Sequence, residues 1–195
     1  MSEPHPPTTG TPDSLQAPWR LEYLESVSAA EKKSGPPAAG SGSFLRDYWL
    51  DPAGDERNHV VVRTAESGPG SGEGGMILLN AFPYANGHLL VALGEARPTL
   101  LDYTPGQRAA LWRLTEVAAE LMQRTLDPQG INFGINQGRA AGAGVPGHLH
   151  VHLVPRWGGD VNFMTVVGNV RVMPGSLGAM AERYRAVWAD LRGRP

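Results

Sequence analysis

Apolar and polar positions alternate along the chain in short blocks that predict a sheet. Five blocks have the length and the aliphatic content of strands. They are residues 59–64, 76–79, 89–93, 131–135 and 149–154. A glycine-rich stretch, residues 68–75, separates the first two blocks, which therefore predict a hairpin with an enlarged loop.

The strongest helix signal follows Thr104, which is placed to cap the first turn. Pro105 occupies the first helical position and Gln107 completes a capping box. Apolar residues then recur at helical spacing in one stripe, made of Leu111, Leu114, Ala118, Leu121 and Met122. A second helix is predicted over about residues 176–191, with an inward face made of Leu177, Met180, Tyr184, Val187, Trp188 and Leu191.

The order of these elements is β-β-β-α-β-β-α, with only one long crossover. This order favours an α+β fold, with a mainly antiparallel sheet of about five strands, one long helix and a C-terminal helix. The length of 195 residues suits one domain of ordinary size. We therefore predict a disordered tail over residues 1–14, an N-terminal arm and linker over residues 15–42, and a folded domain over residues 43–195.

Composition narrows the classes of function. The 17 Lys and Arg residues and the 19 Asp and Glu residues leave a formal charge of −2, which argues against a general nucleic-acid or membrane-surface binder. The chain has no cysteine, which excludes disulfides and thiolate zinc sites and fits a reducing, cytoplasmic location. No apolar stretch approaches the roughly 20 residues that a spanning helix needs, so we expect no membrane partner.

Histidine alternates with aliphatic residues in the last predicted strand. Because successive strand side chains point to opposite faces, three of the six histidines share one face, and the aliphatic residues share the other. These three are His148, His150 and His152. A strand that only completes a core has no need of three histidines on one face, so the pattern indicates a functional site.

Three interpretations of these histidines compete. Structural histidines would require three coincidences at a period of two. A two-histidine zinc site stays open, but His148 and His152 are about 13 Å apart along a strand that rises ~3.3 Å per residue, too far for one compact site. The third interpretation is nucleophilic attack on phosphorus by a neutral imidazole whose other nitrogen donates to a carbonyl. The flanking histidines would then donate hydrogen bonds to the negative transition state, and we favour this interpretation.

The loop before this strand, residues 136–147, is rich in glycine. Backbone N–H groups in such a loop can approach a phosphate closely, and its position directly before the histidines strengthens this assignment. A plain flexible loop remains the alternative.

These residues resemble the histidine-triad (HIT) family, whose motif His-φ-His-φ-His-φ-φ matches residues 148–154. The resemblance covers roughly residues 43–173, and residues 78–90 are similar to a second family motif, Asn/Asp-x-x-Pro-x-x-x-Gly-His. It implies that His150 is the nucleophile, that His148 orients it, and that the phosphates are contacted by His152 and Asn136. Gly142 and Gly144 fall in the phosphate loop, and Gly144 stands where many relatives have Ser or Gln.

The second motif implies a nucleoside subsite. By resemblance, Asn80 holds the ribose hydroxyls, Leu78 and Leu90 wall the base, and His88 packs near the triad and supports it. The remaining histidines, His5 and His59, are expected to lie outside the site.

Residues 132–136 and 155–163 look most like the bacterial diadenosine tetraphosphate phosphorylase branch, whose members use inorganic phosphate in place of water. The third histidine, His152, argues against the transferase branch, which has Gln there. Many bacterial relatives carry a Cys-x-x-Cys zinc knuckle near the position of Ser43, and this chain has none, so we expect no structural zinc and no metal at the site.

The sequence thus predicts an enzyme that cleaves diadenosine polyphosphates, with diadenosine tetraphosphate giving ADP and ATP through a nucleotidyl-histidine intermediate. Two alternative functions remain: a hydrolase or phosphoramidase of purine nucleotides, and a nucleotide-binding sensor without turnover. The presence of Gly144 in the phosphate loop is the feature that supports the sensor. We expect no required cofactor, and the sequence leaves open whether Mg²⁺ accompanies the polyphosphate. Members of the family are commonly dimers, so the resemblance implies a homodimer or larger homo-oligomer. We expect no nucleic-acid partner.

Overall fold

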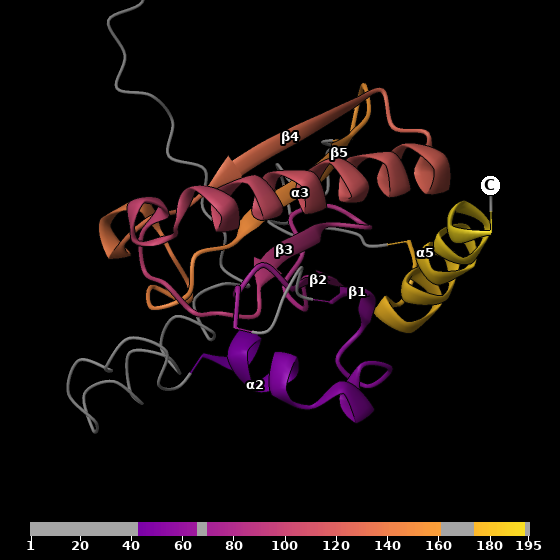
Figure 1. The fold of residues 1–195 in the computed structure, drawn as a ribbon. Helices are drawn as coiled ribbons and strands as arrows, with labels where there is room; N and C mark the ends of the chain where they lie inside the picture. Colours follow the sequence, from indigo (N-terminus) through magenta and orange to yellow (C-terminus); the bar gives the residue numbers. More distant parts are fainter. Residues whose placement is uncertain (1–42, 66–69, 161–173, 194–195) are drawn as a thin grey trace, which may run out of the picture.

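The protein was analysed as a computed structural model, which describes residues 43–65, 70–160 and 174–193 (Figure 1). The predicted tail and arm, residues 1–42, lie outside the described residues. None of the described helices is both long and apolar enough to cross a membrane.

Five strands form one sheet, in which every neighbouring pair is antiparallel. The strands are β1 (Val60–Thr64), β2 (Gly75–Leu79), β3 (Leu89–Leu93), β4 (Gly130–Ile135) and β5 (Val151–Arg156). Their order across the sheet is β1-β2-β3-β5-β4. The predicted α+β fold and the hairpin of the first two strands are both confirmed.

In the part of the chain that the structure describes, three α-helices accompany the sheet: α2 (Phe44–Leu50), α3 (Pro105–Leu126) and α5 (Leu177–Arg192). Short 3-10 turns occupy Pro52–Gly54, Leu100–Asp102 and Arg139–Ala141. Helix α3 begins as predicted, with Thr104 as its N-cap, and it ends at Leu126, because the C-cap residue Asp127 has a left-handed φ of 45°. Ser176 caps α5.

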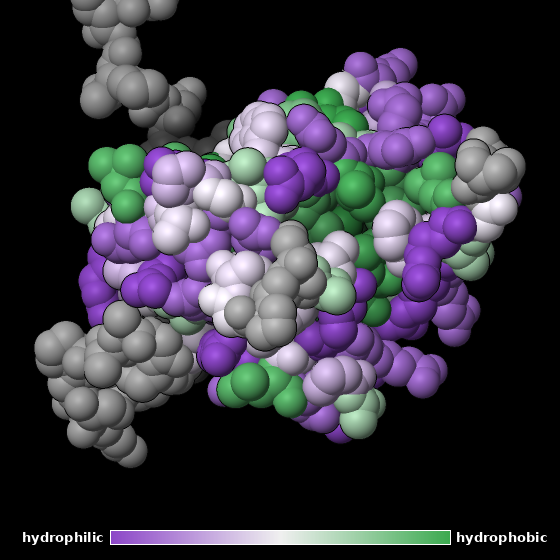
Figure 2. Space-filling model, in the orientation of Figure 1, coloured by the Kyte–Doolittle hydropathy of each residue, from purple (hydrophilic) through white to green (hydrophobic). Residues whose placement is uncertain are grey.

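The two faces of the sheet carry different partners. One face packs against α3 and α5 in the main core, and the aliphatic residues of the histidine strand lie there. Figure 2 shows apolar side chains gathered between α3 and α5 on an otherwise largely polar surface. The other face carries a smaller cluster that α2 covers with Phe44, Tyr48 and Trp49.

One row of paired residues crosses this second face and ends at the triad. Val60 pairs with Leu78, Leu78 with Leu90, and Leu90 with His152. Because paired residues in neighbouring strands point to the same side, the row joins an apolar floor to the last histidine. The alternation that the sequence predicted, with histidines on one face and aliphatic residues on the other, is confirmed.

Strand β5 begins two residues later than the sequence predicts. The backbone N–H of Leu149 donates to the carbonyl of Arg97 at 2.8 Å, and that of His148 donates to Val145 at 3.1 Å. The first two histidines therefore precede the ladder, and their backbone is held by a loop and by the chain that follows β3.

Helix α2 was not predicted. It is only seven residues long, too short for a periodic stripe, yet Ser43 caps it by accepting from the N–H of Arg46 at 3.3 Å. Its Trp49 ring lies against Gly94, where a Cβ atom would collide with the ring. The small glycine thus lets α2 lie close to the end of β3.

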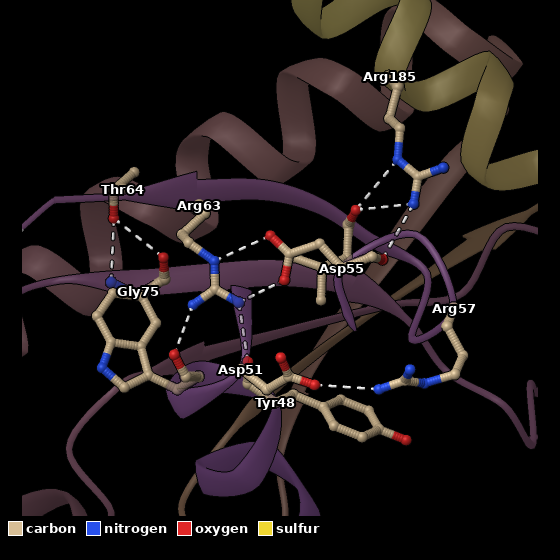
Figure 3. A network of polar contacts seen from close by, with 10 residues as sticks. Tyr48, Asp51, Asp55, Arg57, Arg63, Thr64, Gly75 and Arg185 are labelled. Carbon is tan, nitrogen blue, oxygen red and sulfur yellow. Dashed lines mark hydrogen bonds and ion pairs between the residues drawn. The ribbon is translucent and has the colours of Figure 1, made fainter. Parts of the chain in front are cut away.

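An arginine on β1 fixes the other end of α2 (Figure 3). The guanidinium of Arg63 donates to the carbonyls of Tyr48 at 2.8 Å and Trp49 at 2.9 Å, where the helix leaves carbonyls unsatisfied. Asp55 accepts from the same guanidinium at 2.9 Å. We call this arrangement the Arg63 clasp, and it seats α2 on the sheet face that carries the triad.

Candidate active site

A cavity of about 430 Å³ lies between α2 and the histidine face of the sheet. Phe44 and Tyr48 of α2 line one side of it. Six of the residues proposed from the sequence line it as well: Leu78, Asn80, Leu90, Gly144, His150 and His152. The cavity therefore brings together the expected apolar walls, the expected ribose-binding amide and two members of the triad.

The middle histidine presents a nucleophilic nitrogen. The Nδ1 atom of His150 lies 2.9 Å from the backbone carbonyl of His148. Because a carbonyl only accepts, Nδ1 carries the hydrogen, and the lone pair is left on Nε2. Burial lowers the pKa of His150, so the ring is neutral near pH 7. These are the features that a histidine nucleophile requires.

The first histidine is buried and held at both ring nitrogens. The Nε2 atom of His148 donates to the carbonyl of Leu93 at 2.8 Å, and its Nδ1 atom lies 2.9 Å from the hydroxyl of Ser43. Its side chain is fully buried, and burial lowers its pKa to about 4. His148 is therefore a neutral group that lies behind His150, a position that suits the orienting role expected from the sequence.

The third histidine is oriented by His88. The Nδ1 atom of His88 accepts from the backbone N–H of Tyr84 at 3.1 Å, so its hydrogen lies on Nε2. That Nε2 atom is 3.0 Å from Nδ1 of His152 and donates to it. Because its Nδ1 accepts this hydrogen bond, His152 carries its own hydrogen on Nε2. His150 and His152 thus offer complementary groups, a lone pair and a donor, on rings whose centroids are 4.8 Å apart.

Asn80 connects the lining of the cavity to this pair. Its Oδ1 atom accepts from the N–H of Phe82 at 3.0 Å, and its Nδ2 atom lies 3.3 Å from Nδ1 of His88. The Tyr84 ring stacks on His88 with a centroid distance of 5.1 Å. The segment between β2 and β3 therefore supports His88 from two sides.

Two predicted phosphate contacts do not line the cavity. Asn136 is half-buried just after β4, and Gly142 is exposed with a φ of 81°. His88 and His148 do not line it either, because each lies behind another histidine. The phosphate roles of Asn136 and Gly142 stay predictions from the resemblance.

Several residues at the site were missed from the sequence. His59, expected outside the site, lines the cavity together with Arg57 and Asn58. Its backbone has a φ of 53°, a value that residues other than glycine rarely adopt. Strand β1 carries a register irregularity directly after it. Ser43 was missed too. A serine is a common N-cap residue, and it accepts from the N–H three residues later, here that of Arg46, so its presence could have indicated the start of a helix.

Among the described residues, no group of three or more His, Cys, Asp or Glu side chains could hold a metal ion. Most imidazole nitrogens of the site contact one another, the hydroxyl of Ser43 or backbone carbonyls, and Nε2 of His150 keeps its lone pair.

Comparisons with known proteins agree with this geometry. Residues 72–159 match the family model of the HIT domain. The AP-4-A phosphorylase of Mycobacterium tuberculosis (strain CDC 1551 / Oshkosh) is 34% identical over 182 residues, which are 92% of this chain and 88% of that protein. The bis(5'-adenosyl)-triphosphatase of Dictyostelium discoideum is 32% identical over 79 residues, which are 40% of this chain and 52% of that protein.

Among solved structures, a zinc-bound histidine triad family protein from Mycobacterium smegmatis superimposes with a TM-score of 0.57. It is 25% identical, and the match covers 77% of this chain and 98% of that one. The long match to the mycobacterial protein, together with the triad and the sheet that carries it, shows that the chain belongs to the HIT family.

Proposed function

We propose that this protein is a dinucleoside polyphosphate phosphorylase that converts diadenosine tetraphosphate and inorganic phosphate to ATP and ADP. One observation carries the proposal: the hydrogen bond from Nδ1 of His150 to the carbonyl of His148, which leaves the Nε2 lone pair on a ring that lines the cavity. The name of the mycobacterial relative, which matches over most of both chains, supports the choice of substrate.

In the first step, Nε2 of His150 attacks the phosphorus next to one adenosine. A phosphorus–nitrogen bond forms, and the bond from that phosphorus to the bridging oxygen breaks, so that ATP leaves. The Nε2 hydrogen of His152 is placed to be donated to the phosphate oxygens or to the departing oxygen. The enzyme then carries AMP on His150.

In the second step, an oxygen of inorganic phosphate attacks the same phosphorus. The phosphorus–nitrogen bond breaks, ADP leaves, and His150 regains its lone pair. Gly144 lines the cavity beside the triad, and the absence of a side chain there leaves room for a phosphate ion. Water in place of phosphate would give AMP, which is the outcome of a hydrolase.

The products decide between these outcomes. We expect ADP and ATP in equal amounts when purified protein is incubated with diadenosine tetraphosphate and excess phosphate. AMP and ATP at every phosphate concentration would identify a hydrolase. Turnover of adenosine phosphoramidate alone would identify a phosphoramidase, and nucleotide binding without any turnover would identify a sensor.

We also propose that two chains associate through β4. This strand lies at the edge of the sheet, and Phe133 and Ile135 on it are exposed, as is Trp112 on α3. An apolar edge strand of this kind offers both unpaired backbone groups and a surface to bury. Light scattering should give twice the chain mass, and Phe133→Glu should lower it, whereas a monomeric parent protein would refute the proposal.

A further inference from the structure

We propose that Ser43 is a positioning residue for catalysis: its hydroxyl holds His148 in the tautomer and orientation that aim His150 at the substrate. The catalytic part of this inference rests on the proposed function. The geometric part, that Ser43 donates to His148, does not.

The direction of the hydrogen bond from Ser43 follows from its neighbours. The carbonyl of Leu93 accepts from Nε2 of His148, so Nδ1 of that ring has a lone pair and can only accept. The hydroxyl of Ser43, 2.9 Å away, must therefore donate its hydrogen to Nδ1. Its lone pairs remain available, and one accepts from the N–H of Arg46 at 3.3 Å. Both contacts of the hydroxyl are thus satisfied at once.

Ser43 is well placed to transmit this constraint. Its side chain is 3% exposed, and it belongs to a helix that is held at its far end by the Arg63 clasp and near its start by a hydrogen bond from Arg46 to the carbonyl of Gly94. The hydroxyl is therefore a fixed donor. It comes from 105 positions away in the chain, so no local sequence constraint places it beside His148.

The constraint reaches the nucleophile through the backbone. With both ring nitrogens of His148 engaged, its ring cannot rotate, and its backbone N–H is bonded to Val145 at 3.1 Å. The carbonyl of the same residue accepts from His150. Without the hydroxyl, Nδ1 of His148 would be a buried acceptor with no donor, and a buried polar group in that state drives rearrangement. The carbonyl that orients His150 would move with it.

Substitution of Ser43 tests the inference. Ser43→Gly removes the hydroxyl from His148 but keeps a residue that is tolerated as a helix N-cap. We expect kcat for diadenosine tetraphosphate to fall roughly ten- to a hundredfold, the loss seen where a partner that orients a metal-bound histidine is removed, with KM changed by less than about threefold. Ser43→Thr keeps the hydroxyl and should restore kcat.

Ser176→Gly is the matched control. Ser176 caps α5 in the same way, by accepting from the N–H of Ala179 at 3.2 Å, and it lies exposed at the start of that helix. This variant loses the same kind of capping contact and should keep kcat, whereas Ser43→Gly also leaves Nδ1 of His148 without its donor and should lose more stability. Equal losses of kcat in the Ser43 and Ser176 glycine variants, or an unchanged kcat in Ser43→Gly, would overturn the positioning role.

A measurement on the unaltered protein keeps the inference testable if Ser43→Gly does not fold. Nitrogen-15 NMR of the histidine rings should show His148 with its hydrogen on Nε2 and an accepting Nδ1. A hydrogen on Nδ1 would refute the donation from Ser43. If the protein cleaves no dinucleotide, the proposed function fails, but the tautomer of His148 still decides whether Ser43 donates to it.

Discussion

The Nε2 atom of His88 lies 3.0 Å from the Nδ1 atom of His152, although 64 positions separate the two residues in the chain. The donor in this contact is His88, because its other nitrogen, Nδ1, already accepts from the backbone N–H of Tyr84. The hydrogen of His152 is thereby confined to Nε2. A residue that does not line the cavity thus decides what the triad presents to a phosphate.

Replacing His88 should impair acid catalysis more than nucleophilic attack. In His88→Phe the ring is kept beside Tyr84 but the donor to His152 is lost. We expect kcat for diadenosine tetraphosphate to fall roughly 100-fold, within the range that general-acid catalysis contributes. A p-nitrophenyl ester of AMP, whose leaving group needs no proton, should be cleaved with a much smaller loss.

A double variant tests whether the two histidines act as one unit. If His88 acts through His152, then His88→Phe combined with His152→Ala should be no slower than His152→Ala alone. Multiplied losses, or equal losses on the two substrates, would mean that His88 has a separate role.

The nucleophile itself gives the simplest expectation. His150→Ala should reduce turnover to background, because it removes the Nε2 lone pair of the proposed nucleophile, and it should leave the fold intact, because the ring lines a cavity and is hydrogen-bonded to the backbone carbonyl of His148. Turnover and an unfolding curve measured on the same preparation check both points. A rate near that of the parent protein would rule out the nucleotidyl-histidine mechanism.

The strict alternation of the histidine strand explains why so much of the site was predictable. A period of two places His148, His150 and His152 on one face whatever the rest of the chain does. The capping box at Thr104 is equally local, and it fixed the start of α3 correctly. Features that a few neighbouring residues determine were visible in the sequence.

The residues that were missed depend on contacts across the fold. Ser43 contacts His148 only because α2 lies over the end of β3. Helix α2 is too short to show a periodic apolar pattern in the sequence. His59 was expected to be the first residue of a strand, but its left-handed backbone turns the chain just before β1 begins at Val60. The path of the glycine-rich loop likewise decides that Gly144 lines the cavity while Gly142 does not.

His148 should stay neutral well below pH 6.5. Burial lowers the pKa of His148 to about 4 and also lowers that of His150. NMR titration of the ring signals, assigned with His→Gln variants, should show no protonation of His148 at pH 5.5 and a midpoint for His150 below 6.5. Titration of His148 with a midpoint near 6.5 would contradict the burial argument.

The same shift predicts a loss of stability in acid. At pH values above 6.5 the ring is neutral in both states, and its contribution to stability is fully present. As the pH falls from 6.5 toward 4, the unfolded chain takes up a proton that the folded protein refuses, so the free energy of unfolding decreases. His148 alone should account for about 2 kcal/mol between pH 7 and pH 5. Denaturant unfolding at the two values, repeated on a folded His148→Gln variant, isolates that share.

The Arg63 clasp should support both stability and substrate binding. Arg63→Met keeps the stem against Trp49 but removes the donors to two helix carbonyls and the partner of Asp55. We expect a loss of roughly 1.5–3 kcal/mol in the free energy of unfolding, the range for hydrogen bonds to a charged group. KM should also rise, because α2 walls the cavity.

Arg124→Met provides the comparison for the clasp. Arg124 pairs with Glu120 on the exposed side of α3, and an exposed pair of this spacing contributes about 0.5 kcal/mol or less. A clasp variant no less stable than this control would show that α2 is seated by its apolar contacts alone.

His59 offers a test in which stability and function should move in opposite directions. Its φ of 53° is one that glycine adopts without strain, and its side chain lines the cavity in which we propose that the substrate binds. His59→Gly should therefore preserve or raise the free energy of unfolding, by up to about 1 kcal/mol, while KM for diadenosine tetraphosphate increases. His59→Ala removes the same ring but keeps the backbone strain, so it should share the higher KM without the gain in stability. If KM is unchanged in both variants, His59 is strained for a reason other than substrate binding, since only contact with the nucleotide would make both substitutions costly.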